Sequence, residues 1–449
     1  MHDARPICIL WDASHIWGLM AWRALRALGL ACRLVKGKEI AEGALLGKQG
    51  RAERSCSPGC ASTPLLLVPG GNARLKALAL GKAGREAVRA YLARGGSYLG
   101  FCGGAGLALS QRDARDGLNI CPWSRAAYPE RLHHLISGHV RVRAHCQGDA
   151  RLLPAFLQDA SRAHGLSLPV WWPGRFAPEE RDDVSVLAAY AAPDTDFWLA
   201  DLPLQGIPAQ VFEAWQALYG VNLSADFLTD QPLVISGTFG KGRYVLSYSH
   251  LETPESRDAN AWLAHLLRAL TGLEPGAELI PAWNLHEPGA AWTDDSRGAP
   301  LLEGLRMTRA LLDLAVDHNL FFERTPWLWG WRAGLPGAAC NNLHAALCTA
   351  VSLAPGKAAL DFWDTARPRF ARLMPLFQAG AEGYLLACRL AETLAPSLPG
   401  AVDKRGLSNQ REALFGHAMH GGGLVEELLT IVEELIYLSQ DCPARGSQA

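Results

Sequence analysis

Short apolar runs alternate with helix-spaced segments in the first quarter of the chain. The strand-like runs are Pro6–Trp11, Leu30–Val35, Leu65–Val68 and Ser97–Phe101. Between them, Gly18–Leu28 and Arg85–Arg94 repeat apolar residues three and four positions apart, as an amphipathic helix does. Continuous apolar strands separated by helices are typical of a parallel sheet covered on both faces. We therefore predict an α/β domain with a doubly wound, mostly parallel sheet.

The pattern changes twice further along the chain. After Arg112 the strand-like runs are Leu135–Val142, Val184–Ala191, Leu233–Ser236 and Lys241–Ser249, which predict a mixed or antiparallel extension. A helix over Ala259–Leu270 closes this part, and Gly272–Pro281 has the composition of a linker. Beyond Pro300 the helical segments are Leu301–Asp317, Ala338–Val351, Ala358–Phe377, Ala381–Leu394 and Gly423–Leu438. We predict an α/β domain over residues 1–275 and an all-helical domain over residues 276–449.

Composition narrows the class of protein. Of 449 residues, 49% are hydrophobic and 19% are charged, which suits a globular chain of two or three domains. The formal net charge of −1 gives no overall basic field, so we expect no nucleic-acid partner. No apolar run reaches the roughly 20 residues that span a bilayer, so we expect no membrane partner. The 11 cysteines are scattered and odd in number, which favours a reducing compartment and predicts a cytoplasmic protein.

One cysteine stands where a strand should turn into a helix. Gly100-Phe101-Cys102-Gly103-Gly104 follows a strand-like run and precedes a helical one, as in the tight turn that carries an exposed nucleophile in G-x-S-x-G proteins. Small neighbours let other backbone approach, and the Gly103 N–H can donate to an oxyanion. The same pentapeptide also fits a glycine-rich turn around a buried thiol. Cys121 is a rival thiol, but no acid or base neighbours it in sequence.

Two further segments favour the catalytic interpretation. Pro69-Gly70-Gly71 follows a fully apolar strand and can present backbone N–H groups to the same sheet edge. His250-Leu251-Glu252 follows the strand that ends at Ser249, so His250 could accept the thiol proton and Glu252 could orient the imidazole. The alternatives are an ordinary strand-ending turn and an exposed loop histidine. If the sheet is parallel, all three segments project from the same edge.

Two other groups of residues are weaker candidates for a functional site. Trp171-Trp172-Pro173-Gly174-Arg175 could bind a planar ligand with its aromatic faces and a carboxylate with its guanidinium, or it could be a packed corner. His417 and His420 precede four glutamates, but the Glu-x-x-His order of bundle metal sites is absent. We expect no metal and no organic cofactor.

The order of these motifs resembles class I glutamine amidotransferases. A PGG turn, a G-x-C-x-G turn and a late strand ending in H-x-E stand in that order here. The resemblance implies that Cys102 is the nucleophile, His250 the general base and Glu252 the orienting acid. It also implies that Gly70, Gly71, Gly103 and Gly104 line the oxyanion and substrate site.

One branch of that superfamily is more similar still: the N-terminal domain of eukaryotic-type biotin-protein ligases, which also occurs as separate bacterial proteins. The segments that carry this resemblance are GGSYLGFCGGAGLAL, RLHHLISGHVRV, LPVWWPGRF, VSVLAAY and GKGRYVLSYSHLE. The ligase module itself is missing, since no GRGRRG-like loop occurs and the second half is helical. We therefore do not expect biotin-ligase activity from this chain.

Two hypotheses follow for function. The first is an amidotransferase-like enzyme in which the thiolate attacks the carbonyl of a small amide or acyl substrate. The second is a non-catalytic module that keeps the fold and binds a small molecule or protein, with the helical domain forming a homo-oligomer or holding a protein partner. Gly106 favours the second, because the resemblance places a substrate-holding Gln at that position.

Overall fold

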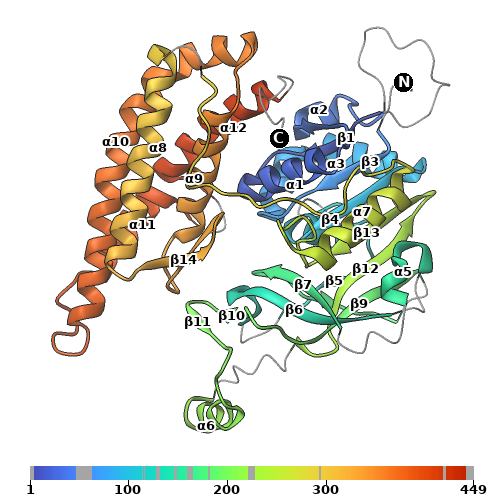
Figure 1. The fold of residues 1–449 in the computed structure, drawn as a ribbon, viewed down its shortest axis with the longest axis horizontal. Coiled ribbons are helices and arrows are strands. Elements are labelled where there is room, and N and C mark those ends of the chain that lie inside the picture. Colours follow the sequence, from blue (N-terminus) through green and yellow to red (C-terminus); the bar gives the residue numbers. More distant parts are fainter. Residues whose placement is uncertain are drawn as a thin grey trace. The chain divides into compact units, whose positions relative to one another are not determined.

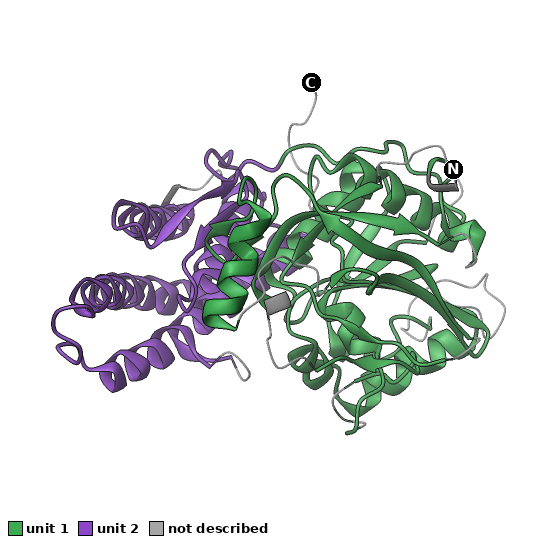
Figure 2. Cartoon of the chain, turned by 90° about the horizontal axis from the view of Figure 1, so that it is seen from below, with its two compact units in different colours: residues 1–282 green, residues 283–449 purple. Residues whose placement is uncertain are grey.

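The computed structural model describes residues 5–46, 63–113, 115, 117–127, 132–145, 149–158, 165–180, 183–220, 228–292, 295–417 and 421–440. The chain divides into two compact units, residues 1–282 and 283–449 (Figure 2). The first is mixed α/β and the second is helical, as the sequence predicts. In the described part of the chain, no helix is both long enough and apolar enough to cross a membrane.

The first unit is built on one large sheet whose parallel half carries the site (Figure 1). Five strands run parallel there, in the spatial order β13 (Gly242–Ser247), β4 (Ser97–Phe101), β3 (Leu65–Val68), β1 (Ile7–Leu10) and β2 (Cys32–Val35). Both β1 and β3 are buried along their whole length, which explains their uninterrupted apolar sequences. The carboxyl ends of these strands meet at one edge of the sheet.

Antiparallel strands extend the sheet beyond β13. The strands are β12 (Pro232–Phe239), β9 (Val184–Pro193), β6 (Ile136–Ala144), β7 (Leu166–Trp171), β10 (Trp198–Leu199) and β11 (Leu202–Pro203). A separate pair is formed by β5 (Ser124–Arg125) and β8 (Phe176–Ala177). The predicted antiparallel extension is therefore confirmed. Strand β13 joins the two halves, since it pairs with β12 antiparallel and with β4 parallel.

The helices of the first unit are α1 (His15–Ala27), α2 (Gly37–Ala41), α3 (Ala73–Ala93), α4 (Gly103–Ala108), α5 (Ala155–Gln158), α6 (Ala209–Tyr219) and α7 (Arg257–Thr271). Helix α1 packs beside β1 and β2, and α7 packs beside β7. Helix α3 begins twelve residues before the predicted segment, because the Asn72 side chain accepts hydrogen bonds from the N–H groups of Arg74 and Leu75 and so caps it. A non-helical Gly81 (φ 59°) kinks α3 in its middle.

The second unit contains α8 (Asp295–Asp317), α9 (Gly337–Ser352), α10 (Lys357–Leu394), α11 (Lys404–Phe415) and α12 (Gly423–Ser439). Two differences from the sequence prediction stand out. The two helices expected on either side of residue 379 are one continuous α10 of 38 residues. The aromatic tract Phe321–Trp331 forms an antiparallel hairpin, β14 (Phe321–Thr325) and β15 (Leu328–Trp331), because alternate side chains of β15 are buried at the two-residue period of a strand.

Candidate functional site

Cys102 lies in a strained turn between β4 and α4. Its φ of 46° and ψ of −103° fall in a region that residues other than glycine rarely adopt. Two backbone hydrogen bonds hold the turn: the Cys102 N–H donates to the Ser247 carbonyl at 2.7 Å, and its carbonyl accepts from Gly106 at 2.9 Å. The side chain is half-buried, so it keeps a path to solvent. The pentapeptide thus forms a tight turn from a strand into a helix.

The glycines around Cys102 let two backbone turns touch. A Cβ at Gly103 would lie 1.9 Å from the carbonyl oxygen of Gly71, and a Cβ at Gly104 would lie 2.0 Å from that of Val68. Gly71 has a φ of 103°, and a Cβ there would strike the Ala13 carbonyl oxygen at 2.2 Å. No residue with a side chain fits these positions. The turn after β3 is therefore packed directly against the start of α4.

His250 and Glu252 form a fully buried pair just beyond the end of β13. The Nδ1 of His250 lies 2.7 Å from Oε1 of Glu252, and neither side chain is exposed. The His250 N–H donates to the carbonyl of Pro169 at 3.0 Å, which ties this segment to β7. Because Nδ1 faces the carboxylate, the other ring nitrogen, Nε2, is left for chemistry.

The imidazole of His250 is enclosed by Gly70 and Trp17. A Cβ at position 70 would lie 2.6 Å from Cε1 of His250, so glycine is the residue that leaves room for the ring. The Trp17 ring lies over the imidazole with centroids 4.2 Å apart. Gly70 thus has a packing role that the sequence did not indicate, and Trp17, from α1, was missed altogether. The three residues come from different elements at one sheet edge.

The Cys102 thiol and the His250 imidazole interact. Burial lowers the pKa of His250, but the charge of Glu252 and hydrogen bonding with the side chains of Cys102 and Glu252 outweigh burial and raise this pKa to about 9. Among the described residues, Nε2 of His250 has no hydrogen-bond partner of ordinary geometry. No hydrogen bond of ordinary geometry therefore joins the Cys102 thiol to Nε2. Catalytic hydrogen bonds are commonly long in unliganded sites and tighten when substrate binds.

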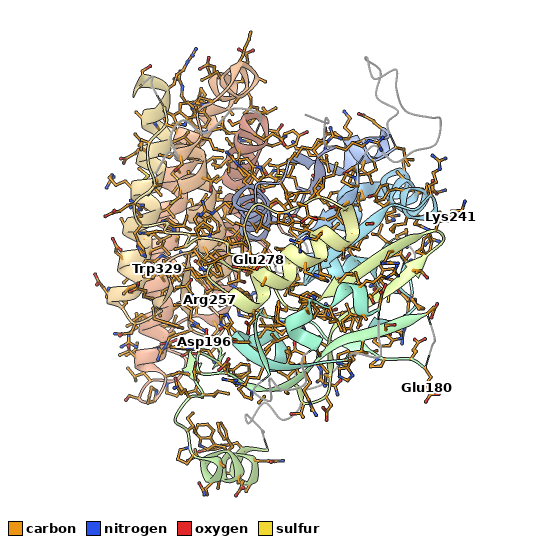
Figure 3. All side chains as sticks on the ribbon, turned by 45° about the vertical axis from the view of Figure 1, so that its right-hand side comes forward. Glu180, Asp196, Lys241, Arg257, Glu278 and Trp329 are labelled. Carbon is orange, nitrogen blue, oxygen red and sulfur yellow. The ribbon has the colours of Figure 1, made fainter. Side chains whose placement is uncertain are left out.

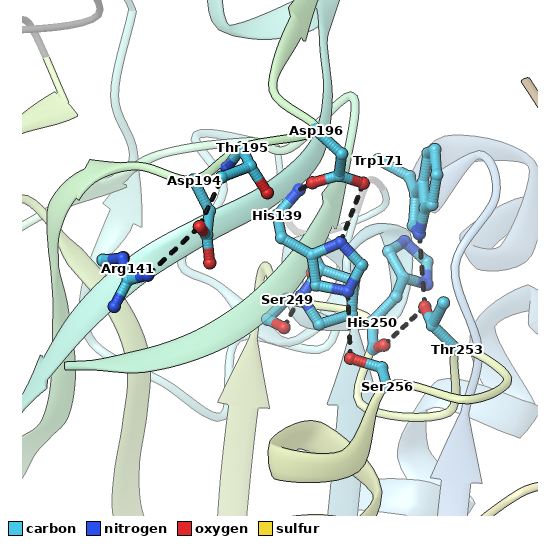
Figure 4. A network of polar contacts seen from close by, with 11 residues as sticks. His139, Arg141, Trp171, Asp194, Thr195, Asp196, Ser249, His250, Thr253 and Ser256 are labelled. Carbon is cyan, nitrogen blue, oxygen red and sulfur yellow. Dashed lines mark hydrogen bonds and ion pairs between the residues drawn. The ribbon is translucent and has the colours of Figure 1, made fainter. Parts of the chain in front are cut away.

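A hydrogen-bonded scaffold holds the segment that carries His250 and Glu252. Trp171 Nε1 donates to Oγ1 of Thr253 at 3.2 Å, and this hydroxyl donates to the carbonyl of His250 at 2.8 Å (Figure 4). The side-chain amide of Asn260, in α7, donates to the carbonyls of Leu251 and Thr253 at 2.9 and 2.8 Å. The backbone on both sides of Glu252 is thus fixed.

The surroundings of Cys102 include polar groups that the sequence did not single out. Tyr190 and Tyr248 are each 2% exposed, and neither hydroxyl has a hydrogen-bond partner among the described residues. Burial raises the pKa of each phenol, and the nearby Cys102 thiol raises it further. The charge of Arg175, which is 4% exposed, acts on Tyr190 in the opposite direction. Two unsatisfied buried hydroxyls are suited to hold a polar ligand.

The motif Trp171–Arg175 is packed against residues around His250, as in the packed corner that the sequence allows. Trp171 is bound to Thr253, and Trp172 meets Trp17 edge to face with ring centroids 6.1 Å apart. The rival thiol, Cys121, is buried, and burial raises its pKa to about 11. Among the described residues, no group of three or more His, Cys, Asp or Glu side chains could hold a metal ion. His420 lies outside the described residues.

Residues 55–114 match the model of a protein family described as biotin-protein ligase, N terminal. The matched segment contains β3, α3, β4 and the Cys102 turn, but it ends well before His250 and Glu252. This is the family that the sequence motifs predict, and the match confirms the resemblance over these residues. Among curated proteins, none matches the chain.

The chain is also similar, at low scores, to several solved structures. One is a ThuA-like protein from Bacteroides uniformis ATCC 8492, with 14% identity over 60% of this chain and 93% of that one, and a TM-score of 0.34. Two are β-galactosidases, from Rahnella sp. R3 and Bacillus circulans sp. alkalophilus, each with 13% identity over 61% of this chain and 32% of that one. Their TM-scores are 0.31 and 0.32, and these likenesses carry no functional argument.

Proposed function

We propose that the first unit, whose residues 55–114 match the biotin-protein ligase N-terminal family, is a cytoplasmic amidotransferase-like enzyme. In this proposal Cys102 is the nucleophile, His250 the general base and Glu252 the residue that orients it. The substrate is a small amide or acyl compound. The observation that carries the proposal is the buried His250–Glu252 hydrogen bond of 2.7 Å, next to a half-exposed thiol in a strained turn.

The chemistry starts from the state in which the proton shared by Cys102 and His250 lies on Nε2 of His250, so that Cys102 is a thiolate. The sulfur then bonds to the substrate carbonyl carbon, and the carbonyl oxygen becomes an oxyanion. The protonated imidazole returns its proton to the leaving amine or alcohol as the carbon–heteroatom bond breaks, which leaves a thioester on Cys102. Water, activated by His250, hydrolyses the thioester, or an acceptor amine takes the acyl group. The charge of Glu252 stabilises the imidazolium that forms between these steps.

Backbone N–H groups are proposed to stabilise the oxyanion. The Gly103 N–H follows the nucleophile directly, and the turn at Gly70 and Gly71 is packed against it through the glycine contacts described above. Preorganised donors of this kind contribute about 10²- to 10³-fold in rate each. Tyr190 and Tyr248 are proposed to bind polar atoms of the substrate with their buried hydroxyls.

The proposal is tested by alkylation of the intact protein with iodoacetamide at pH 7, followed residue by residue with peptide mass spectrometry. Cys32 is the internal reference, because it is also half-buried and burial raises its pKa to about 11. We expect Cys102 to react at least tenfold faster than Cys32. His250→Gln should lower the Cys102 rate at least tenfold, and Glu252→Gln should lower it less.

Two glycine variants separate local geometry from general damage. Gly70→Ala places a Cβ against the imidazole and should lower Cys102 reactivity about as much as His250→Gln. Gly106→Ala is the matched control, since a Cβ there meets one atom, Cβ of Ala73, at an ordinary 3.5 Å. A Cys102 rate that does not change on His250→Gln would contradict the enzymatic proposal. After incubation with aryl esters or primary amides, a mass increase of the Cys102 peptide by one acyl group would support it.

A second candidate function is a non-catalytic binding module with the same fold. Gly106 favours it, because the resemblance places a substrate-holding Gln there and the structure has room for a side chain at this position. This alternative predicts that Cys102 forms no acyl adduct. It also predicts that a bound small molecule would protect Cys102 from alkylation in both the native chain and His250→Gln.

A further inference from the structure

His139, on β6, lies at the centre of a second polar network in the first unit (Figure 4). Its Nδ1 lies 3.0 Å from Oδ2 of Asp196, and its Nε2 lies 3.1 Å from Oγ of Ser256. The three residues are far apart in sequence and come from β6, the loop before β10, and the start of α7. Figure 3 labels Asp196 and also Arg257, the residue that follows Ser256. A carboxylate, an imidazole and a hydroxyl thus stand in line.

The Asp196 carboxylate is held by two donors from one residue. The backbone N–H of His139 donates to Oδ1 at 2.8 Å, while the ring nitrogen Nδ1 contacts Oδ2. This double contact fixes the carboxylate relative to the ring. It also favours the tautomer with the proton on Nδ1, so that Nε2 accepts a hydrogen bond from the Ser256 hydroxyl. The orientation is the one that a general base needs.

Ser256 is placed unusually for a serine at the start of a helix. It occupies the N-cap position of α7, where a serine side chain normally accepts a hydrogen bond from the helix backbone. No side chain caps this turn, and the hydroxyl of Ser256 is directed to His139 instead. Glu255, just before it, has a positive φ of 58°. Ser256 therefore gives up the usual stabilising role of its position in favour of contact with an imidazole.

A cavity of about 320 Å³ lies beside the segment that carries Asp196. Its lining includes Asp194 and Thr195, which precede Asp196 in the chain, and Phe197, which follows it. Arg141 also lines it and lies two residues after His139, so both project from the same face of β6. The apolar part of its wall is formed by Pro193, Phe197, Leu204 and Phe212. The cavity has the size and lining for a small apolar group.

We propose that Ser256, His139 and Asp196 form a second acyl-transfer site, a serine hydrolase site for esters that carry a small apolar group. Ser256 is the nucleophile, His139 the general base, and Asp196 the positioning residue that acts through His139. The proposal is independent of Cys102, because no atom of the first site takes part in it. The observations that carry it are the in-line contacts of 3.0 and 3.1 Å and the cavity beside the Asp196 segment.

The reaction balances with water as the other reactant. The Oγ proton of Ser256 passes to Nε2 of His139 as Oγ bonds to the ester carbonyl carbon. The tetrahedral intermediate collapses, the bond to the alcohol oxygen breaks, and that oxygen takes the proton from His139. Water then attacks the acyl-serine, with His139 as base, and releases a carboxylic acid and the restored hydroxyl. The first turn of α7 has no hydrogen bond to its N-cap side chain, so its N–H groups can donate to the oxyanion.

The test uses the full chain with Cys102→Ala, so that the thiol cannot contribute. An alkyl fluorophosphonate probe is added, and the modified residue is mapped by mass spectrometry; hydrolysis of p-nitrophenyl butyrate is followed in parallel. We expect one phosphonyl group on Ser256. His139→Gln should abolish labelling, and Asp196→Asn should lower both rates at least tenfold while KM changes little. Ser97→Ala, whose hydroxyl binds the carbonyl of Leu270 elsewhere in the unit, should change neither.

Ser256→Gly guards against a variant that fails to fold. Glycine is well tolerated at an N-cap and destabilises the fold less than alanine does there. Loss of labelling and hydrolysis in a folded Ser256→Gly supports the proposal. Absence of any label on Ser256 in the Cys102→Ala protein, or hydrolysis that persists in Ser256→Gly, overturns it. Either result leaves the proposal for Cys102 untouched.

Discussion

At the scale of single residues, His250 has the most unusual environment at the site. An imidazole without exposed surface would ordinarily be neutral, because burial disfavours its charge. Here the Glu252 carboxylate and hydrogen bonding with Cys102 and Glu252 raise the pKa of His250 to about 9. The proton on this ring is therefore tied to the folded state. The stability of the fold should therefore depend on this proton.

The stability of the first unit should depend on pH through His250. Its pKa is about 9 in the folded chain and 6.5 ordinarily, so the charged ring stabilises the fold fully below pH 6.5. This contribution is lost as pH rises through 9. The difference corresponds to at most about 3 kcal/mol. Hydrogen exchange of the β4 and β13 peptides should report a fall in protection free energy between pH 6.5 and 9.

The matched variant for this prediction is Glu252→Gln, which removes the charge that holds the proton on His250. Its protection free energy should be lower at pH 6.5 and should no longer fall towards pH 9. If the native chain and Glu252→Gln lose protection in parallel over this range, the His250–Glu252 pair is not the source of the dependence.

At the scale of elements, the position of α4 decides how Cys102 is presented. The Tyr98 hydroxyl donates to the carbonyl of Gly104 at 2.6 Å and ties α4 back to β4. The glycines at 103 and 104 let the helix start against the end of β3 without a side chain between them. Sequence periodicity predicts that a strand and a helix meet here. Positions 103 and 104 must lack side chains because the end of β3 and the turn after it pack against them, and β3 lies more than thirty residues earlier in the chain.

Alanine at Gly104 should therefore be costly, and alanine at Gly106 should not. The Gly104 Cβ would lie 2.0 Å from the carbonyl oxygen of Val68, and backbone cannot give way as a side-chain tip can. Overpacking of this kind costs about 1–3 kcal/mol or more. Gly106→Ala meets an ordinary contact and should be neutral or stabilising by about 0.5–1 kcal/mol, as for alanine in a helix. Urea unfolding measures both; equal midpoints would show that the predicted clash is relieved elsewhere.

At the scale of the whole molecule, the described contacts at both proposed sites lie within residues 1–282. The linker predicted over Gly272–Pro281 is not a loose connection. The N–H of Gly276 donates to the carbonyl of Leu28 at 2.8 Å. Ile280 accepts from the N–H of Glu255 at 2.9 Å and donates to Oδ1 of Asn260 at 3.0 Å. Asn260 in turn holds the backbone beside Glu252, so this segment supports the site.

The residue at which a shortened chain ends should consequently affect its Cys102 alkylation rate and its stability. A chain that ends at Ala282 should keep the Cys102 alkylation rate of the full chain within about twofold. A chain that ends at residue 275 loses both Ile280 hydrogen bonds and should show slower alkylation and a lower unfolding midpoint. Each lost hydrogen bond is worth about 1 kcal/mol. Indistinguishable behaviour of the two shortened chains would mean that Ile280 does not support the His250 segment.

The sequence alone determined which residues end the strands of the first unit. Cys102 and His250 follow strands whose apolar pattern is local, and parallel strands bring their carboxyl ends to one edge, so their proximity could be predicted. Only the tertiary structure decided what surrounds them. Trp17 over His250 depends on how α1 packs. Ser256 meets His139 across 117 residues of sequence because α7 packs beside β7, which pairs with β6. Periodicity encodes the face that a residue occupies, whereas the partner on that face is set by the order of strands in the sheet.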